Sequence, residues 1–221
     1  MTRAPRPRPH WGFEDEALAT GAARIFGTDE VGRGPLAGPV TAAAVLLPRD
    51  LPAEVLAAID DSKRVPATRR DWLAERLQAL APCHVAHATV AEIDRLNIRR
   101  AAHLAMCRAV AGLAAQIGAP DLVLVDGRDT PEGLPHPARA IIKGDAHSLS
   151  IAAASILAKV GRDRIMVDLA QQHPGYGWEK NAGYGTAQHR EALRNLGVTP
   201  AHRRTFGTVH KILYQDPTTN P

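Results

Sequence analysis

The sequence predicts an α/β protein, because short apolar strands alternate with helices along the whole chain and no internal repeat is present. The segment 121-DLVLVDG-127 is continuously apolar until Asp126, which is typical of a central strand buried on both faces. The segments 98–118 and 150–172 have the length and spacing of long helices. In the second of these, several alanines would allow close packing on a sheet.

The remaining elements follow the same alternation. Strands are expected over 23–30 and 139–145, each ending in acid, over 41–48, which a proline closes, and over 83–90. Thr68 is expected to cap a helix over 69–80, Ser148 or Ser150 to start the helix that ends at 172, and Thr186 to cap a short helix. The apolar stripe expected on the 69–80 helix consists of Trp72, Leu73, Leu77 and Leu80.

Composition narrows the possible classes of protein. With 221 residues, 45% of them hydrophobic, the chain can form one sizeable domain without covalent staples. Its two cysteines, Cys83 and Cys107, make neither a disulfide framework nor a zinc pattern, so a reducing cytoplasm is expected. The start, 1-MTRAPRPRPH-10, is basic and proline-rich but lacks a signal peptide's apolar core, and no apolar run reaches 18 residues. The net charge of +4 suits a polyanionic partner.

The acids carry the functional signal. Asp29, Glu30, Asp126 and Asp145 each stand at the end of an expected strand, where they could converge on one rim of a sheet. Ionised carboxylates so close together need cations among them, and oxygen ligands favour Mg²⁺ or Mn²⁺. Two such ions can hold the attacking and leaving oxygens of a phosphodiester.

Two observations oppose this interpretation. Any one acid after a strand can simply form a turn or a cap. Asp29 and Glu30 are also neighbours, and neighbouring strand residues face opposite sides, so a shared site requires the strand to end or bulge there. The glycines at 32 and 34 make that plausible.

Nine short motifs, in order, closely resemble ribonuclease HII, the bacterial type 2 ribonuclease H family. They span residues 23 to 210, and the first is highly specific. The motifs are 29-DEVGRGPLAGPV-40, 60-DDSK-63, 92-EIDRLNI-98, 125-VDG-127, 143-KGD-145, 152-AAASILAKVGRD-163, 173-HPGYGW-178, 183-GYGT-186 and 202-HRRTF-206.

The resemblance implies a ribonuclease H-like fold, a mixed β-sheet flanked by helices with a small C-terminal helical and loop region. It implies an enzyme that uses Mn²⁺ or Mg²⁺, two ions during catalysis. Such an enzyme cuts the RNA strand of RNA–DNA hybrids and incises DNA 5′ of single embedded ribonucleotides, leaving a 3′-hydroxyl and a 5′-phosphate. A monomer is expected. The implied organisation is a flexible tail over 1–20, a catalytic domain over 21–210 that includes a substrate-binding segment over 173–210, and a tail over 211–221.

The resemblance also implies roles for the acids. Asp29, Glu30 and Asp126 correspond to metal ligands, and Asp145 to the fourth catalytic and metal-binding carboxylate. Asp163 is the rival for the last role. If 150–163 is helical, however, Asp163 lies about 20 Å along the axis from its start, so it is expected to be a structural partner, with an arginine as the candidate.

The resemblance assigns recognition of the 2′-hydroxyl to the backbone of Gly32, Arg33 and Gly34, since glycine permits close approach. The simpler alternative is that residues 32–34 only form a tight turn. A dinucleotide-binding loop is a weaker alternative, because no second acid-tipped βαβ unit has the required spacing. Tyr184 corresponds to a tyrosine that stacks on the sugar at the RNA–DNA junction. Without the resemblance, Tyr184 could simply pack a glycine-rich loop. The chain departs from many relatives at Ala182, where they have lysine.

Three lysines, Lys63, Lys143 and Lys159, match family positions near substrate phosphates, with Arg203 and Arg204 further away. Solvated surface charges are the alternative for each of these. The ten histidines form no metal pattern. Two further functions remain as alternatives: a module of the same fold that grips hybrids without cutting, which would not need all four acids, and another two-metal nuclease such as a resolvase, which would have no reason for the 32–34 loop.

Overall fold

The sheet of the computed structural model, which describes residues 7–214, has five strands in the order β3-β2-β1-β4-β5. Strand β2 pairs antiparallel with both β3 and β1, and β1, β4 and β5 are parallel, so the sheet is mixed as expected. The strands are β1 (Ile25–Val31), β2 (Val40–Val45), β3 (Cys83–Ala88), β4 (Leu122–Asp126) and β5 (Ala138–Ile141).

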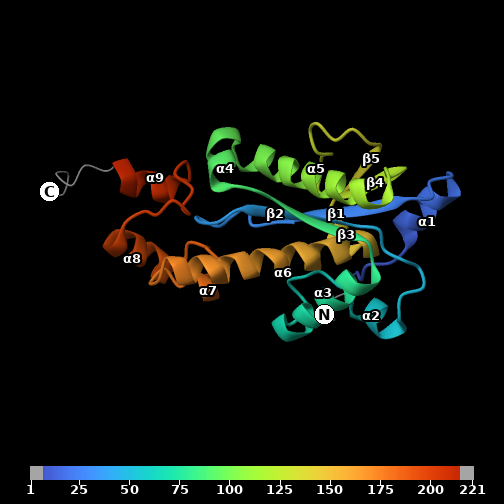
Figure 1. Ribbon diagram of the computed structural model, residues 1–221, viewed down its shortest axis with the longest axis horizontal. Helices are drawn as coiled ribbons and strands as arrows, with labels where there is room; N and C mark the ends of the chain where they lie inside the picture. Colours follow the sequence, from blue (N-terminus) through green and yellow to red (C-terminus); the bar gives the residue numbers. More distant parts are fainter. Residues whose placement is uncertain (1–6, 215–221) are drawn as a thin grey trace, which may run out of the picture.

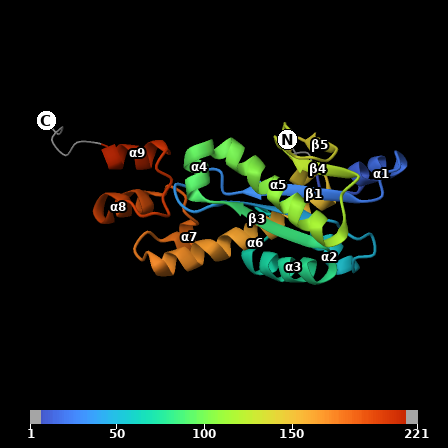
Figure 2. The ribbon, with the colours of Figure 1, turned by 45° about the horizontal axis from the view of Figure 1, so that its top comes forward.

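Helices cover both faces of the sheet (Figure 1). One face carries α6, with α2 and α3 beside it, and the other carries α5 and α4 (Figure 2). Helix α7 packs against α6, while α8 and α9 extend beyond one end of the sheet. The helices are α1 (Gly12–Ala19), α2 (Ala53–Ala58), α3 (Ala67–Leu80), α4 (Val90–Leu96), α5 (Ile98–Ile117), α6 (Leu149–Gln172), α7 (Trp178–Asn181), α8 (Ala187–Leu196) and α9 (Gly207–Tyr214), with a 3₁₀ turn η1 at Gly144–Ala146. Within residues 7–214, no helix combines the length and apolarity needed to cross a bilayer.

Helix α6 packs unusually close to the central strand. A Cβ atom at Gly27 in β1 would lie 2.3 Å from the carbonyl carbon of Ser150, so only glycine fits there. The first turns of α6 present a run of fully buried alanines to the sheet, Ala152, Ala153 and Ala154. These small residues bring β1 and α6 together, and Ser148 starts the helix by accepting a hydrogen bond from the Ile151 amide.

Two local expectations are wrong. Thr68 does not cap α3, because the helix already begins at Ala67 after Pro66, whose fixed φ suits a helix start. On α3, Leu73 and Leu77 are buried, whereas Trp72 and Leu80 are 37% and 36% exposed, so the apolar stripe is narrower than expected. Thr186 does cap α8, through a 3.2 Å hydrogen bond from the His189 amide.

The boundaries of the two expected tails also need correction. Residues 12–19 form α1, whose buried Glu14 accepts hydrogen bonds from the Ser148 hydroxyl (2.7 Å) and the Ser150 amide (3.0 Å). The carboxylate therefore holds the start of α6 and makes α1 part of the folded domain. Residues 211–214 belong to α9. Residues 1–6 and 215–221 of the expected tails lie outside the described residues.

A separate apolar cluster anchors the C-terminal segment, and it contains two buried histidines that the sequence did not single out. The Nε2 atoms of His189 and His202 lie 3.2 Å apart. His189 Nε2 also accepts a 3.0 Å hydrogen bond from Trp178, while Thr199 donates its amide to Nδ1 of His202. These bonds require both imidazoles to be neutral.

We expect this histidine pair to make the fold sensitive to acid. Burial, followed by the charge of His189, lowers the pKa of His202 to about 4. The unfolded chain thus binds more protons between pH 6.5 and 4, so the free energy of unfolding falls as the pH decreases through that window, by about 1–2 kcal/mol from pH 7 to 5. Urea unfolding at both pH values would measure it. The His202→Gln variant should lose less of its free energy of unfolding between pH 7 and 5 than the wild type. The His210→Gln variant, which changes an exposed histidine, should lose as much as the wild type. Equal losses in both variants would refute the assignment of the pH dependence to His202.

Candidate active site

Three of the expected acids converge. Asp29, Glu30 and Asp126 each place one carboxylate oxygen so that all three oxygens lie within 4.8 Å of one another. Asp29 and Glu30 come from β1, and Asp126 from the last position of β4. Asp29 is only 5% exposed, so the cluster lies at the bottom of a depression rather than on a flat surface.

The strand neither ends nor bulges at the two adjacent acids, contrary to the condition set by the sequence. The ladder between β1 and β2 continues in register through Val31 and Thr41. The ladder between β1 and β4, however, stops at the pair Thr28 and Val125. Beyond that pair no strand of the described chain covers this edge of β1, so side chains from opposite faces can both reach Asp126.

The electrostatics of the cluster disfavour three free carboxylates. Burial, followed by the charges of Asp126, Glu30 and Asp145, raises the pKa of Asp29 well above its usual value. Burial also raises the pKa of Glu30 to about 7, although Arg33, 3.1 Å away, opposes the shift. Burial raises the pKa of Asp126 as well, against the hydrogen bonds it accepts from main-chain amides, including that of Gly144 at 2.6 Å.

The donor set fits divalent cations. Oε2 of Glu30 is buried and has no hydrogen-bond partner among the described residues. An oxygen in that position is costly unless something positive reaches it. Three carboxylates with raised pKa values and one orphaned oxygen are the arrangement expected of a site for a hard cation, with Asp29, Glu30 and Asp126 as its ligands.

Asp145 lies beside the cluster rather than within its tightest group. It occupies η1, beyond the end of β5 at Ile141, so the strand expected over 139–145 is shorter than expected. Its pKa is raised by burial and then by the charges of Asp126 and Asp61, which places it in the same electrostatic environment. Two cavities adjoin the acids. One contains Glu30 and Asp126, and the other contains Asp126 and Asp145 together with Lys63 and Lys143.

The three lysines have different surroundings. Burial lowers the pKa of Lys63, but Asp61, Asp145, Asp29 and Asp126 reverse this effect and raise it. Lys63 is thus a cation held over the acids. Lys143 lines the same cavity, in a left-handed backbone conformation with φ 57°. Lys159 differs, since its Nζ lies 2.7 Å from Asp163 and it lines neither cavity beside the acids.

Asp163 is a structural partner, as expected. Its second oxygen lies 3.6 Å from Arg70, so it joins α6 to α3. Residues that the sequence did not single out also help to build the site. The hydroxyl oxygens of Ser155 and Ser62 lie 2.8 Å apart in a hydrogen bond, and Ser155 also hydrogen bonds to the Asp29 carboxylate. The 60-DDSK-63 and 152-AAASILAKVGRD-163 motifs contained the signal, but only the fold shows that they meet.

Two buried arginines organise the glycine loop that follows β1. Arg203 was expected to lie further from the substrate phosphates than the lysines, with a solvated surface charge as the alternative. The surface alternative is wrong, because the exposure of Arg203 is 0% and it donates to main-chain carbonyls. Arg162 donates to three main-chain carbonyls, those of Ala37, Pro39 and Ala182. Arg203 donates to the carbonyls of Gly32, Arg33, Pro35, Gly38 and Pro39. The two guanidiniums therefore fix the loop and connect it to the segment around Ala182. Arg204, in contrast, is exposed.

Glycine is required at 32 and favoured at 34 by different contacts. Gly32 has φ 93°, and a Cβ there would lie 2.1 Å from Nε of Arg162. At Gly34 a Cβ would lie 3.3 Å from the ring of Tyr184. The ring of Tyr184 therefore lies next to the loop and is 47% exposed, unlike Tyr176 and Trp178, which are buried. Packing explains the latter two aromatics but leaves a free face on Tyr184.

Solved structures share this architecture. The crystal structure of the ribonuclease H2 from Pyrococcus horikoshii OT3 matches with a TM-score of 0.72 and 26% identity, covering 86% of this chain and 96% of that one. A structure of Bst-RNase HIII in complex with Mn²⁺ matches with a TM-score of 0.72 at 21% identity, covering 89% and 71%. The fold and the acid cluster define an enzyme of the ribonuclease H-like class.

Sequence comparison specifies the family. The model of the family "Ribonuclease HII" matches residues 26–214. Ribonuclease HII of Cereibacter sphaeroides (strain ATCC 17025) is 60% identical over 96% of this chain and 98% of its own length. Ribonuclease HII of Paracoccus denitrificans (strain Pd 1222) is 60% identical over 95% and 97%. The chain belongs to the ribonuclease HII family and is an endoribonuclease of the ribonuclease H type.

Proposed function

We propose that this enzyme cleaves the RNA strand of RNA–DNA hybrids and also incises DNA on the 5′ side of single embedded ribonucleotides, leaving a 3′-hydroxyl and a 5′-phosphate. The observation that carries the proposal is the position of the 32–34 loop. It follows β1 directly after Asp29 and Glu30, with Tyr184 beside it. In the proposed function, the loop that contacts the ribose is therefore adjacent to the acids that serve hydrolysis of the phosphodiester.

The acids prepare the site for hydrolysis. Asp29, Glu30 and Asp126 would hold Mg²⁺ or Mn²⁺, with Asp145 completing the set from η1. When bound, two such ions supply Lewis acidity to the attacking and leaving oxygens. Lys63, whose pKa is raised by the surrounding acids, keeps its charge and can contact a phosphate oxygen at the rim.

The loop supplies the distinction between RNA and DNA. A 2′-hydroxyl both donates and accepts hydrogen bonds, so main-chain amides and carbonyls can recognise it. Gly34 is exposed and has no side chain in the way, while Gly32 and the buried arginines keep the loop in one conformation. A loop already ordered loses little entropy on binding, which favours selectivity.

The presence of all four acids favours an enzyme over a module that binds without cutting. The loop and Tyr184 favour a ribose-reading enzyme over a resolvase. The cavities near the acids suit a polyanionic substrate. We also propose that the enzyme is a monomer, because one chain supplies the whole acid set.

A single labelled duplex tests the proposal. It is DNA with one ribonucleotide, incubated with Mg²⁺, with Mn²⁺ and with chelator beside an all-DNA duplex. We expect a metal-dependent nick 5′ of the ribonucleotide and no cut in the control. Binding without a nick would instead favour the non-cutting module, and cutting of the all-DNA duplex would remove the role given to the 32–34 loop.

Substitution of Tyr184 tests the sugar contact. Tyr184→Ala should lower kcat/KM at a single ribonucleotide by about 10-fold or more, since loss of one stacking platform costs about 1–3 kcal/mol. Tyr184→Phe should retain most of the activity because the flat ring remains. Tyr214→Ala, which removes another exposed tyrosine from α9, is the matched control. Equal activities of Tyr184→Ala and the control would contradict the stacking role.

A further inference from the structure

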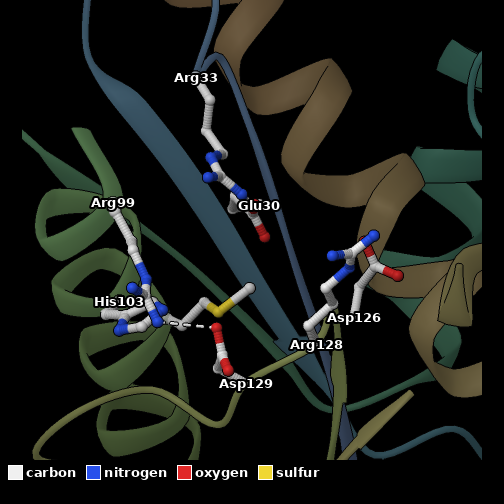
Figure 3. Close-up of a pocket in the computed structure, with 9 residues that line it drawn as sticks. Glu30, Arg33, Arg99, His103, Asp126, Arg128 and Asp129 are labelled. Carbon is white, nitrogen blue, oxygen red and sulfur yellow. Dashed lines mark hydrogen bonds and ion pairs between the residues drawn. The ribbon is translucent and has the colours of Figure 1, made fainter. Parts of the chain in front are cut away.

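A cavity of about 330 Å³ opens beside the acid cluster on the face of the sheet covered by α5 (Figure 3). It shares Glu30 and Asp126 with the cluster, so it is continuous with the site of hydrolysis. Its other lining residues come from the glycine loop, from α5 and from the segment that follows β4. They are Arg33, Arg99, His103, Met106, Gly127, Arg128 and Asp129.

The cavity is rich in cations. Three guanidiniums line it, against a single carboxylate outside the acid cluster, Asp129, whose oxygen lies 2.8 Å from Arg99. Arg33 lies 3.1 Å from Glu30. Arg128 makes no ion pair with any residue in the described range 7–214, and Figure 3 shows its side chain beside that of Asp126. Positive charge therefore remains available next to the acids.

His103 adds a neutral donor. Its Nδ1 accepts a 3.3 Å hydrogen bond from the Glu132 amide, so the ring proton resides on Nε2. Burial, followed by the charges of Arg99 and Arg33, lowers the pKa of His103, although Asp129 and Glu132 oppose the shift. The imidazole is thus a hydrogen-bond donor that does not compete with the arginines for counter-charge.

We propose that Arg99, Arg128 and His103 form a subsite for a backbone phosphate of the cleaved strand, the one adjacent to the phosphate that is hydrolysed. The inference rests on the proposed function and adds the residues that hold the strand in register. Guanidiniums bind phosphate oxygens bidentately, and an imidazole Nε2–H can donate to the same group. The ligand class is a phosphodiester within a nucleic acid.

The position of the cavity selects which phosphate it would hold. The hydrolysed phosphate must meet Asp29, Glu30 and Asp126 together, and Asp29 does not line this cavity. A phosphate in the cavity is therefore a different one. Because the cavity shares two acids with the cluster, the next phosphate along the same strand reaches it more directly than one across the duplex.

Helix α5 offers a matched control. Arg100 follows Arg99, and both side chains are 63% exposed. Each is paired with a carboxylate, Arg100 with Glu132 at 3.6 Å. Arg100, however, lines a neighbouring cavity that shares His103 but contains neither Glu30 nor Asp126. Arg99→Gln and Arg100→Gln thus remove the same charge from the same helix, and only the first removes it from the proposed subsite.

The first test is the salt dependence of binding. Dissociation constants of a labelled DNA duplex with one ribonucleotide would be measured across KCl concentrations with Ca²⁺, after a gel confirms that no product forms. Arg99→Gln and Arg128→Gln should each weaken binding several-fold and reduce the slope of log Kd against log salt by about 1. Arg100→Gln should leave the slope at the wild-type value. Equal slopes in all three variants would overturn the subsite.

The second test locates the phosphate. Methylphosphonates, which remove one negative charge, would replace single phosphates on either strand. We expect one position next to the cut, on the cleaved strand, to weaken wild-type binding yet have no further effect on Arg128→Gln. Non-additivity on the complementary strand only, or at no position, would overturn the assignment. Nicking by the wild-type enzyme with Mg²⁺ is measured separately, since its absence counts against the proposed function and not against the subsite.

Discussion

Asp126→Asn should reduce cleavage of a ribonucleotide-containing duplex by at least about 1,000-fold while the protein stays folded. Asp126 is the acid at which both adjacent carboxylates of β1 meet, so its replacement removes a shared ligand rather than a peripheral one. Single-turnover cleavage with Mg²⁺ and with Mn²⁺ would measure the loss. Asp29→Asn should behave in the same way.

The same substitution should not destabilise the metal-free protein. Burial, followed by the charge of Asp126, raises the pKa of Asp29, and burial raises the pKa of Asp126 itself. At pH 8 with chelator, removal of one charge relieves the repulsion between the two carboxylates, so the free energy of unfolding of Asp126→Asn should equal or exceed that of the wild type. A structural acid would show the reverse.

Asp163→Asn is the matched control for both measurements. Asp163 joins Lys159 and Arg70 away from the cluster. Its replacement should leave cleavage within a few-fold of the wild type and lower stability slightly. Wild-type rates in Asp126→Asn, or a large loss in Asp163→Asn, would mean that the metal ligands have been misassigned.

Among the substitutions that act on the glycine loop, Arg203→Gln should lower the free energy of unfolding the most. Arg203 is fully buried and donates to five main-chain carbonyls between Gly32 and Pro39. Burial lowers its pKa to about 9, yet it remains charged at neutral pH. A glutamine cannot reach all five acceptors, and buried unsatisfied carbonyls cost about 1–3 kcal/mol each when no water replaces the donor. We expect a loss of about 3 kcal/mol or more in the free energy of unfolding.

Arg204→Gln provides the comparison for Arg203→Gln. Its side chain is exposed, while its main-chain amide donates to Asp94 and is unaffected by the change. Stability should change by less than about 0.5 kcal/mol. Urea unfolding of both variants measures the difference. Similar small losses would show that the loop keeps its conformation without Arg203.

The sequence predicted much of the sheet because the strands are short, apolar and bounded by clear signals. The β4 segment and helix α5 occur almost at the expected residues, since Asp126 and Gly118 end them unambiguously. Helices α1, α2, α4, α7 and α9 were not anticipated, because they are short and depend on tertiary packing more than on periodicity.

Within the site, the types of residue were predictable and the way they meet was not. The acids stood out as a pattern of strand ends, and Asp29, Glu30 and Asp126 do converge. The reason is that the ladder between β1 and β4 stops at Thr28 and Val125, before β1 itself ends, which no local signal in β1 could reveal. Likewise, Arg203 resembled a surface cation in sequence because burial of an arginine depends on distant carbonyls.

Helix α6 sets the spacing between the acid cluster and the glycine loop. Ser155 contacts Asp29, and Arg162, seven residues later, holds the glycine loop, so about 10 Å of rigid helix separates the two supports. Under the proposed function, the helix would set the distance between the bond that is cut and the ribose that the loop contacts. Inserting one residue between them would turn Arg162 by about 100° relative to Ser155. The glycine loop would then no longer keep its present position relative to the acid cluster, although every acid would remain.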